Sequence, residues 1–129
     1  MRRNKLKLAK EWLTKGKHDI ETAQFLYDNN RPTDMIAVHT QQAIEKYLKG
    51  FLIYNGWILR KIHDLEELVT EAIKIDKTFS AFLDPCRVIS RYYFEIRYPP
   101  EAEEYTKEEI KKSLGLAWEI VKKIDRVVK

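Results

Sequence analysis

This chain has little of the material that builds disulfide-linked, β-rich or membrane-spanning proteins. It contains one cysteine, so neither an internal disulfide nor a cysteine-based zinc cluster can form. Its four glycines and four prolines are too few for the closely spaced turns of a β-sandwich or barrel. No apolar run approaches the ~20 residues of a membrane span, and the charged N-terminus lacks the apolar stretch of a signal peptide. We therefore expect a cytoplasmic protein that does not associate with membranes.

The size and charge of the chain suit one globular domain with a mixed surface. We expect a single domain over residues 1–129, since a chain of this length buries about two-thirds of its unfolded surface. The apolar content of 44% argues against disorder. The 24 basic and 20 acidic residues leave a net charge of only +4, which is compatible with nucleic-acid contact without indicating it.

Apolar residues recur at helical spacing through most of the chain, and no segment alternates as a strand does. This pattern predicts an all-α fold in which the long first, second and fifth helices pack side by side and the other two complete the core. The five predicted helices cover residues 4–28, 33–55, 65–75, 77–95 and 106–128.

Several residues predict how these helices begin, end and pack. Thr33 or Asp34 can cap the second helix, and Thr106-x-x-Glu109 forms a capping box at the fifth. Pro85 should kink or restart the fourth helix. Gly16 lies in the apolar stripe of the first helix, which indicates the close approach of a neighbour. We expect the apolar run 57–59 to fold back onto the bundle and Cys86 to be buried.

The predicted second helix divides by angle into an apolar and a polar side. Gln42, Glu45, Lys46 and Lys49 lie opposite the apolar stripe, and His39 lies at its border. An imidazole, an amide and two amines on one side of a helix could bind a phosphate-bearing partner. The alternative is an ordinary solvated helix face.

His63 and Asp64 open the predicted third helix. Asp64 can cap this helix while His63 packs at its entry. Alternatively, His63 lies where a helix N-terminus favours an anion.

A cluster of arginines and tyrosines follows later in the chain. Arg87 and Arg91 are one helical turn apart and can present two guanidinium groups to one phosphate. The cluster also contains Arg97 and the tyrosines at 92, 93 and 98, which could stack on bases. The alternative is that the arginines pair with acidic neighbours and the tyrosines belong to the core.

The sequence lacks the patterns of metal, cofactor and common catalytic sites. There is no His-x-x-x-His or Glu-x-x-His pair for a metal on a helix, and no glycine-rich phosphate loop. We therefore expect neither a metal nor a cofactor, and the residues alone do not indicate a reaction.

Three segments together resemble the HEPN family (higher eukaryotes and prokaryotes nucleotide-binding domain). Residues 39–49 resemble the signature helix of that family, residues 63–68 resemble the segment after it, and Arg97-Tyr98-Pro99 is similar to its late Arg-Tyr-Pro element. The order and spacing agree, so the resemblance spans nearly the whole chain. It implies a five-helix up-and-down bundle that forms a homodimer.

The resemblance also implies a function. Many members act beside a minimal nucleotidyltransferase, often as toxin and antitoxin, which makes such a protein and a nucleotide or RNA the expected partners. We carry over the matched polar residues, together with Arg91, as candidate ligand or partner contacts: His39, Gln42, Lys46, Lys49, His63, Asp64, Arg91, Arg97 and Tyr98.

Two other functions remain open. Ribonuclease members carry an Arg-x(4–6)-His motif, but seven residues separate Arg31 from His39 and two separate Arg60 from His63. A metal-independent ribonuclease would then need His39 or His63 as the base and an arginine from elsewhere to stabilise the phosphorane. The third possibility is a non-catalytic dimeric scaffold with an apolar interface around residues 57–59.

Overall fold

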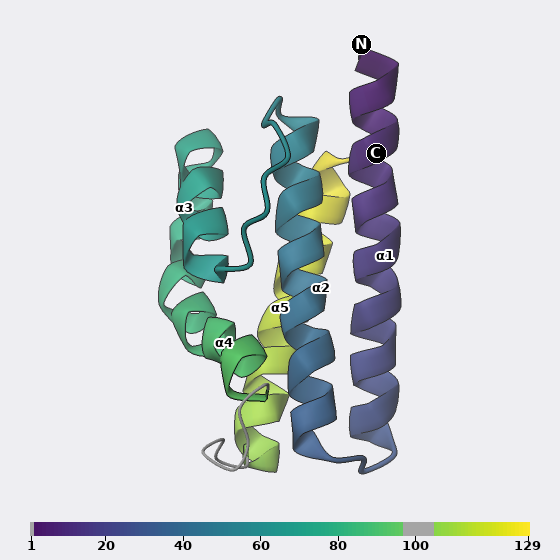
Figure 1. The fold of residues 1–129 in the computed structure, drawn as a ribbon, viewed down its shortest axis with the longest axis vertical. Coiled ribbons are helices and arrows are strands. Elements are labelled where there is room, and N and C mark those ends of the chain that lie inside the picture. The colour runs from purple at the N-terminus through teal and green to yellow at the C-terminus, as the bar shows by residue number, and fades with distance from the viewer. Residues whose placement is uncertain (1, 97–104) are drawn as a thin grey trace.

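The computed structural model confirms the all-α prediction (Figure 1). It describes residues 2–96 and 105–129, and for residues 2–3 and 92–96 it describes the backbone alone. The elements in chain order are α1 (Arg2–Asp28), α2 (Thr33–Tyr54), α3 (Leu65–Ile75), the 3-10 helix η1 (Lys77–Phe82), α4 (Leu83–Ile96) and α5 (Lys107–Val127).

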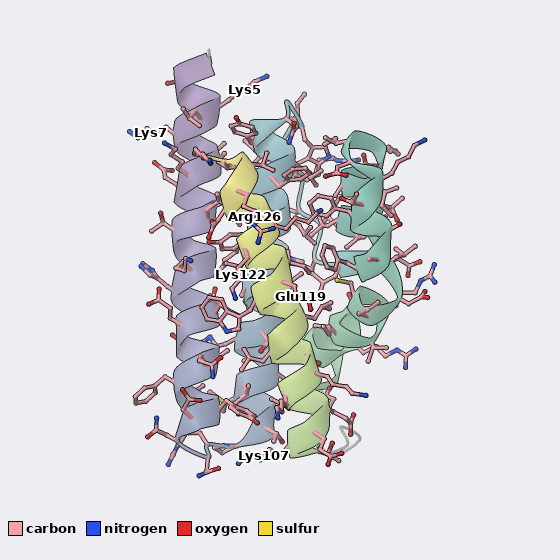
Figure 2. All side chains as sticks on the ribbon, turned by 180° about the vertical axis from the view of Figure 1, so that it is seen from behind. Lys5, Lys7, Lys107, Glu119, Lys122 and Arg126 are labelled. Atoms are coloured by element: carbon pink, nitrogen blue, oxygen red, sulfur yellow. The ribbon has the colours of Figure 1, made fainter. Side chains whose placement is uncertain are left out.

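The central helix of the bundle is α2. It contacts α1 on one side, α3 and α4 on the other, and α5 across its back. Figure 1 shows α1 and α2 as an antiparallel pair, and Figure 2 shows α5 from behind, beside α1. Because α2 has neighbours on several sides, residues all around its circumference are buried, including polar ones.

Most predicted helix ends are confirmed, with one correction. Asp64 caps α3 by accepting from the Glu66 amide at 3.0 Å, and Thr106 and Glu109 form the predicted capping box of α5. The predicted side-chain cap of α2 is wrong: Pro32 occupies the N-cap position, where no side chain accepts from the helix. A fixed φ already suits proline to this end of the helix.

The restart predicted at Pro85 is also present. Residues 77–82 form η1, and α4 then begins at Leu83. Pro85 lies in the first turn of α4, where the missing amide costs no intrahelical hydrogen bond.

Two glycines allow α1 and α2 to approach closely. A Cβ on Gly16 of α1 would lie 2.7 Å from Cδ2 of Tyr47, and a Cβ on Gly50 of α2 would lie 2.6 Å from Cδ2 of Leu13. Neither distance is compatible with a side chain at the present helix spacing. The close approach predicted from Gly16 is therefore confirmed.

The connection after α2 corrects one packing prediction. Trp57 packs against the core, but Ile58 is 82% exposed and Leu59 is also exposed. The predicted return of residues 57–59 to the bundle is thus right for Trp57 and wrong for the other two. Cys86 is fully buried as predicted, and burial raises the pKa of its thiol to about 12. No helix in the described part of the chain is long and apolar enough to cross a membrane.

Candidate functional site

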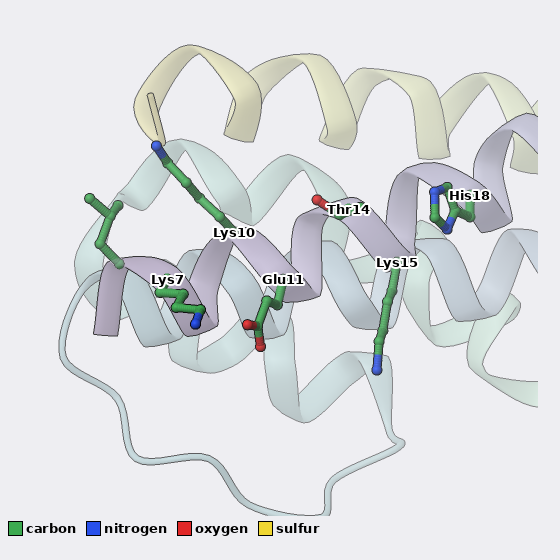
Figure 3. A pocket seen from close by; sticks show the side chains of 7 residues that line it. Lys7, Lys10, Glu11, Thr14, Lys15 and His18 are labelled. Carbon is green, nitrogen blue, oxygen red and sulfur yellow. The ribbon is translucent and has the colours of Figure 1, made fainter. Parts of the chain in front are cut away.

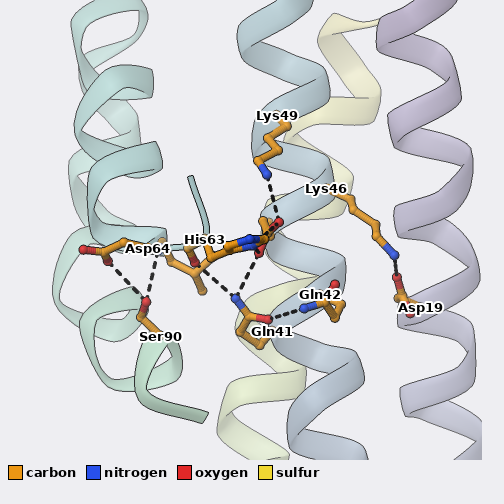
Figure 4. Close-up of polar contacts among 10 residues, drawn as sticks. Asp19, Gln41, Gln42, Lys46, Lys49, His63, Asp64 and Ser90 are labelled. Carbon is orange, nitrogen blue, oxygen red and sulfur yellow. Dashed lines mark hydrogen bonds and ion pairs between the residues drawn. The ribbon is translucent and has the colours of Figure 1, made fainter. Parts of the chain in front are cut away.

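The predicted polar side of α2 begins with two side chains that meet one carboxylate of α1. Asp19 accepts from Nδ1 of His39 at 3.0 Å through one oxygen and pairs with the Lys46 ammonium through the other. Figure 4 shows Lys46 reaching from α2 across to Asp19. All three side chains are at least half-buried. The arrangement neutralises the amine and orients the imidazole, so it ties α1 to α2.

The second part of that polar side is buried, which corrects the expectation of an open surface. Glu45 and Lys49 are each 3% exposed, and their side chains pair at 2.9 Å. The Lys49 ammonium also lies 5.2 Å from the ring centre of Trp12. Lys49 is therefore not available to a ligand in this structure, because α1 covers its side of α2.

Glu45 also holds the connection that leads into α3. Nδ1 of His63 lies 3.2 Å from both carboxylate oxygens of Glu45. The fully buried Gln41 donates to Glu45 and to the carbonyl of His63, each at 3.3 Å, and accepts from Gln42 at 2.9 Å. His63 and Gln42 thus join one network around Glu45, which fixes the segment before α3 against α2.

Asp64 has a structural role at the start of α3. Besides capping the helix, its carboxylate accepts from the Ser90 hydroxyl of α4 at 3.2 Å. The same hydroxyl accepts from the Leu65 amide at 3.1 Å. Asp64 therefore connects α3 with α4, as Figure 4 shows.

The predicted arginine cluster is only partly described. Arg91 is exposed, and Arg97 and Tyr98 lie outside the described residues. Arg87 pairs with Glu66 at 2.9 Å and with Asp84 at 2.8 Å, so its guanidinium group is already neutralised. The ion-pair alternative thus holds for Arg87.

The structure brings the predicted residues together in two groups. His39 and Lys46 meet at Asp19, whereas Lys49, His63 and, through Gln41, Gln42 meet around Glu45. Arg91 joins neither group. The role of Asp19, which lies on another helix, was not predicted from the sequence, and Glu45 was predicted to lie on the polar side of α2 although it is buried. The position of Glu45 one turn from Gln41 and Lys49 was the available signal.

The side chains of this region can transfer protons and form hydrogen bonds. In the part of the chain that the structure describes, no group of three histidine, cysteine, aspartate or glutamate side chains could hold a metal ion. The Asp19–His39 pair is a partly exposed imidazole oriented by a carboxylate, which is the usual arrangement of a general base.

Comparisons with known proteins agree on one family. A family model for the HEPN domain matches residues 9–127. The chain is 30% identical over 141 residues to "Putative toxin MJ1304" of Methanocaldococcus jannaschii, in an alignment that covers 96% of this chain and 90% of that protein.

Two solved structures share the fold. The crystal structure of TT1696 from Thermus thermophilus superposes with a TM-score of 0.75 at 24% identity, covering 92% of this chain and 96% of that one. The crystal structure of ST0689, an archaeal HEPN homologue, gives a TM-score of 0.73 at 19% identity, covering 94% and 98%. With a family match over nearly its whole length, this chain belongs to the HEPN family.

Proposed function

We propose that this HEPN protein is the toxin-like component of a two-protein module, that its partner is a minimal nucleotidyltransferase, and that it binds nucleotide or RNA phosphates. The observation that carries the proposal is the alignment with the relative named as a toxin, which spans nearly the full length of both chains. A match of that extent spans the α1–α2 pair rather than one motif alone.

The polar network gives the proposed partner a defined surface. Lys46 and His39 remain about a quarter and a third exposed beside Asp19. A protein that supplies a carboxylate or a phosphate there would compete with Asp19 for both donors. The surface is therefore suited to a contact that forms and breaks, rather than to a permanent ligand.

Growth and co-purification test this function directly. We expect inducible expression of the chain to slow bacterial growth, and co-expression of a minimal nucleotidyltransferase encoded by an adjacent reading frame to relieve it. The two proteins should co-purify, and Lys46→Ala/His39→Ala should weaken that complex more than Lys61→Ala/Lys77→Ala at exposed positions outside α1 and α2. Normal growth together with no complex would contradict the proposal.

The Asp19–His39 pair supports a second candidate, a metal-independent ribonuclease. His39 would take the proton of a ribose 2′-hydroxyl, and an arginine such as Arg91 would stabilise the phosphorane charge. Digestion of total RNA checks this, with His39→Ala expected to lose cleavage and the exposed Lys61→Ala expected to keep it. Equal cleavage by both variants would exclude His39 as the base.

Exposed apolar residues at one end of the bundle support the proposed homodimer. Ile58 is 82% exposed, and Leu59, Tyr54, Leu6 and Leu8 are each more than a third exposed. Side chains of this kind are often covered in an oligomer. Light scattering at micromolar concentration is expected to give the mass of a dimer, and Ile58→Glu should reduce it to that of a monomer.

A further inference from the structure

Positive charge is concentrated where α1 begins and α5 ends. Residues 4–18 contain five lysines against one glutamate, and residues 122–129 contain three lysines and an arginine against one aspartate. Because the whole chain carries only +4, the remainder is net acidic. These two segments lie side by side, since Lys17 of α1 pairs with Asp125 of α5, and Figure 2 shows Lys5 and Lys7 on the first turns of α1 and Lys122 and Arg126 on the last turns of α5.

A hollow lies between these two segments. It has a volume of about 350 Å³, and its α1 wall carries Lys10, Thr14, Lys17 and His18. Tyr47 and Asp125 also line it. Figure 3 shows the adjoining surface of α1, where Lys10 extends from the helix toward the end of α5. We call this hollow, with Lys122 beside it on α5, the cationic groove.

Two carboxylates line the cationic groove, those of Glu21 and Asp125, and the second is already neutralised. Asp125 accepts from Lys17 at 3.2 Å and from the Tyr47 hydroxyl at 3.1 Å. Its charge is therefore balanced from within the protein, and it repels an incoming anion less than a free carboxylate would.

Other cations of the cationic groove have no such partner. Lys10 and Lys122 are exposed, and neither makes a hydrogen bond, an ion pair or a ring contact with another described residue. Lys10, Thr14 and Lys17 follow one face of α1, and Lys122 lies one turn before Asp125 on α5. The α1 row places a donor at roughly every helical turn of about 5.4 Å.

We propose that the cationic groove binds single-stranded RNA along its phosphate backbone. The inference deepens the proposed function, on which it rests, by locating the RNA phosphates between α1 and α5 rather than at the polar side of α2. Unpaired lysines on both helices beside a hollow suit a chain of regularly spaced phosphates, because each contact releases counterions.

The test is binding of a fluorescein-labelled single-stranded RNA of about 20 nucleotides, followed by fluorescence anisotropy with the full chain. At about 0.1 M salt we expect Lys10→Ala/Lys122→Ala to bind roughly tenfold to thirtyfold more weakly than wild type. The slope of log K against log salt should become shallower by about 1.4. The matched control, Lys61→Ala/Lys77→Ala, removes the same charge elsewhere and should stay within about twofold of wild type. Circular dichroism checks that both variants remain folded.

The results of this experiment distinguish a failure of the cationic-groove proposal from a failure of the proposed toxin-like function. Equal weakening in both double variants, or in neither, would overturn the cationic groove while leaving the toxin-like role to the growth assay. A DNA strand of the same sequence that binds with similar affinity would support backbone recognition, since its phosphates are the same. Binding to phosphatidylserine vesicles with no binding to RNA would overturn the inference in favour of a membrane surface.

Discussion

Charged side chains are paired on the side of α1 that faces α2 and mostly unpaired on the side that faces α5. Toward α2, Lys46, His39 and Lys49 each have a carboxylate partner: Lys46 and His39 share Asp19, and Lys49 has Glu45. Toward α5, Lys17 alone is paired and the other cations of the cationic groove face solvent. The polar residues of the HEPN signature helix therefore hold α1 and α2 together. The exposed lysines of the cationic groove, which belong to no family motif, are available to a polyanion.

This difference has an energetic basis. A paired ammonium must leave its carboxylate before it can bind a phosphate, so the new contact replaces an existing one. An unpaired ammonium exchanges only water and counterions, which favours binding. Substitutions in the polar network of α2 should therefore mainly change the free energy of unfolding. Substitutions in the cationic groove should mainly change the affinity for RNA.

The largest effect is expected at Glu45. Replacing it by alanine leaves the buried Lys49 ammonium without its counter-charge, which costs about 3–5 kcal/mol of unfolding free energy. Urea denaturation measures this. The double variant Glu45→Ala/Lys49→Ala should be less destabilised than Glu45→Ala alone, because no charge then remains buried. A loss below about 1 kcal/mol would indicate that Lys49 reaches solvent.

The next largest effect tests how tightly α1 and α2 pack. Gly50→Ala should cost about 1–3 kcal/mol, since its Cβ would meet Leu13 at 2.6 Å and the carbonyl oxygen of Ala9 at 3.1 Å. Gly115→Ala on α5 is the control, because nothing lies within 4 Å of its Cβ. That variant should gain up to about 1 kcal/mol from helix propensity. Thermal melts of both variants give the sign of each change.

Removing Asp19 should leave Lys46 unpaired, like the exposed lysines of the cationic groove. Asp19→Ala is expected to cost about 1–2 kcal/mol of stability, because the partly buried Lys46 and His39 side chains lose their acceptor. It should also raise the affinity for single-stranded RNA severalfold by freeing Lys46. Anisotropy with the labelled strand measures the gain, and Glu108→Ala at an exposed site provides the matched change in charge. An equal gain in both would show that only net charge matters.

The smallest effect concerns the hydroxyl beneath the cationic groove. Tyr47→Phe removes one hydrogen bond to Asp125 and should cost about 0.5–1.5 kcal/mol near neutral pH.

Tyr47→Phe should also change how the free energy of unfolding depends on alkaline pH. Burial, followed by the nearby Asp125 carboxylate, raises the pKa of Tyr47 above its ordinary value of 10.0. The unfolded chain therefore releases the phenolic proton first, and this contribution to stability falls as pH rises above about 10, by up to about 1.4 kcal/mol per pH unit. Denaturation at a series of alkaline pH values should show a shallower decline in Tyr47→Phe than in wild type.

The sequence predicted the helices well because their ends depend on local chemistry. The capping box at Thr106, the cap at Asp64 and the restart at Pro85 each involve residues within one turn of one another. Gly16 could be interpreted from its position in an apolar stripe. The exception was the start of α2, where Pro32 made a side-chain cap unnecessary.

The candidate site could be predicted less well because it depends on contacts between helices. A helical wheel divides α2 into a buried and an open side, yet α2 has neighbours on both, so Glu45 and Lys49 are enclosed. Asp19 comes from α1, and nothing in the order of residues links it to Lys46. The cationic groove was hidden for a different reason: a modest net charge gives no sign that positive charge gathers at the two ends of the chain.

The burial of Cys86 makes it practical to label a cysteine introduced elsewhere in the chain. As the chain's one thiol, shielded and held protonated at neutral pH, it should react slowly with maleimides. A cysteine introduced at Arg126 or Lys10 would then carry a spin label or a photocrosslinker alone, without a cysteine-free background. The native protein is thereby ready for attaching a reporter beside the α1–α5 hollow and for measuring what comes near it.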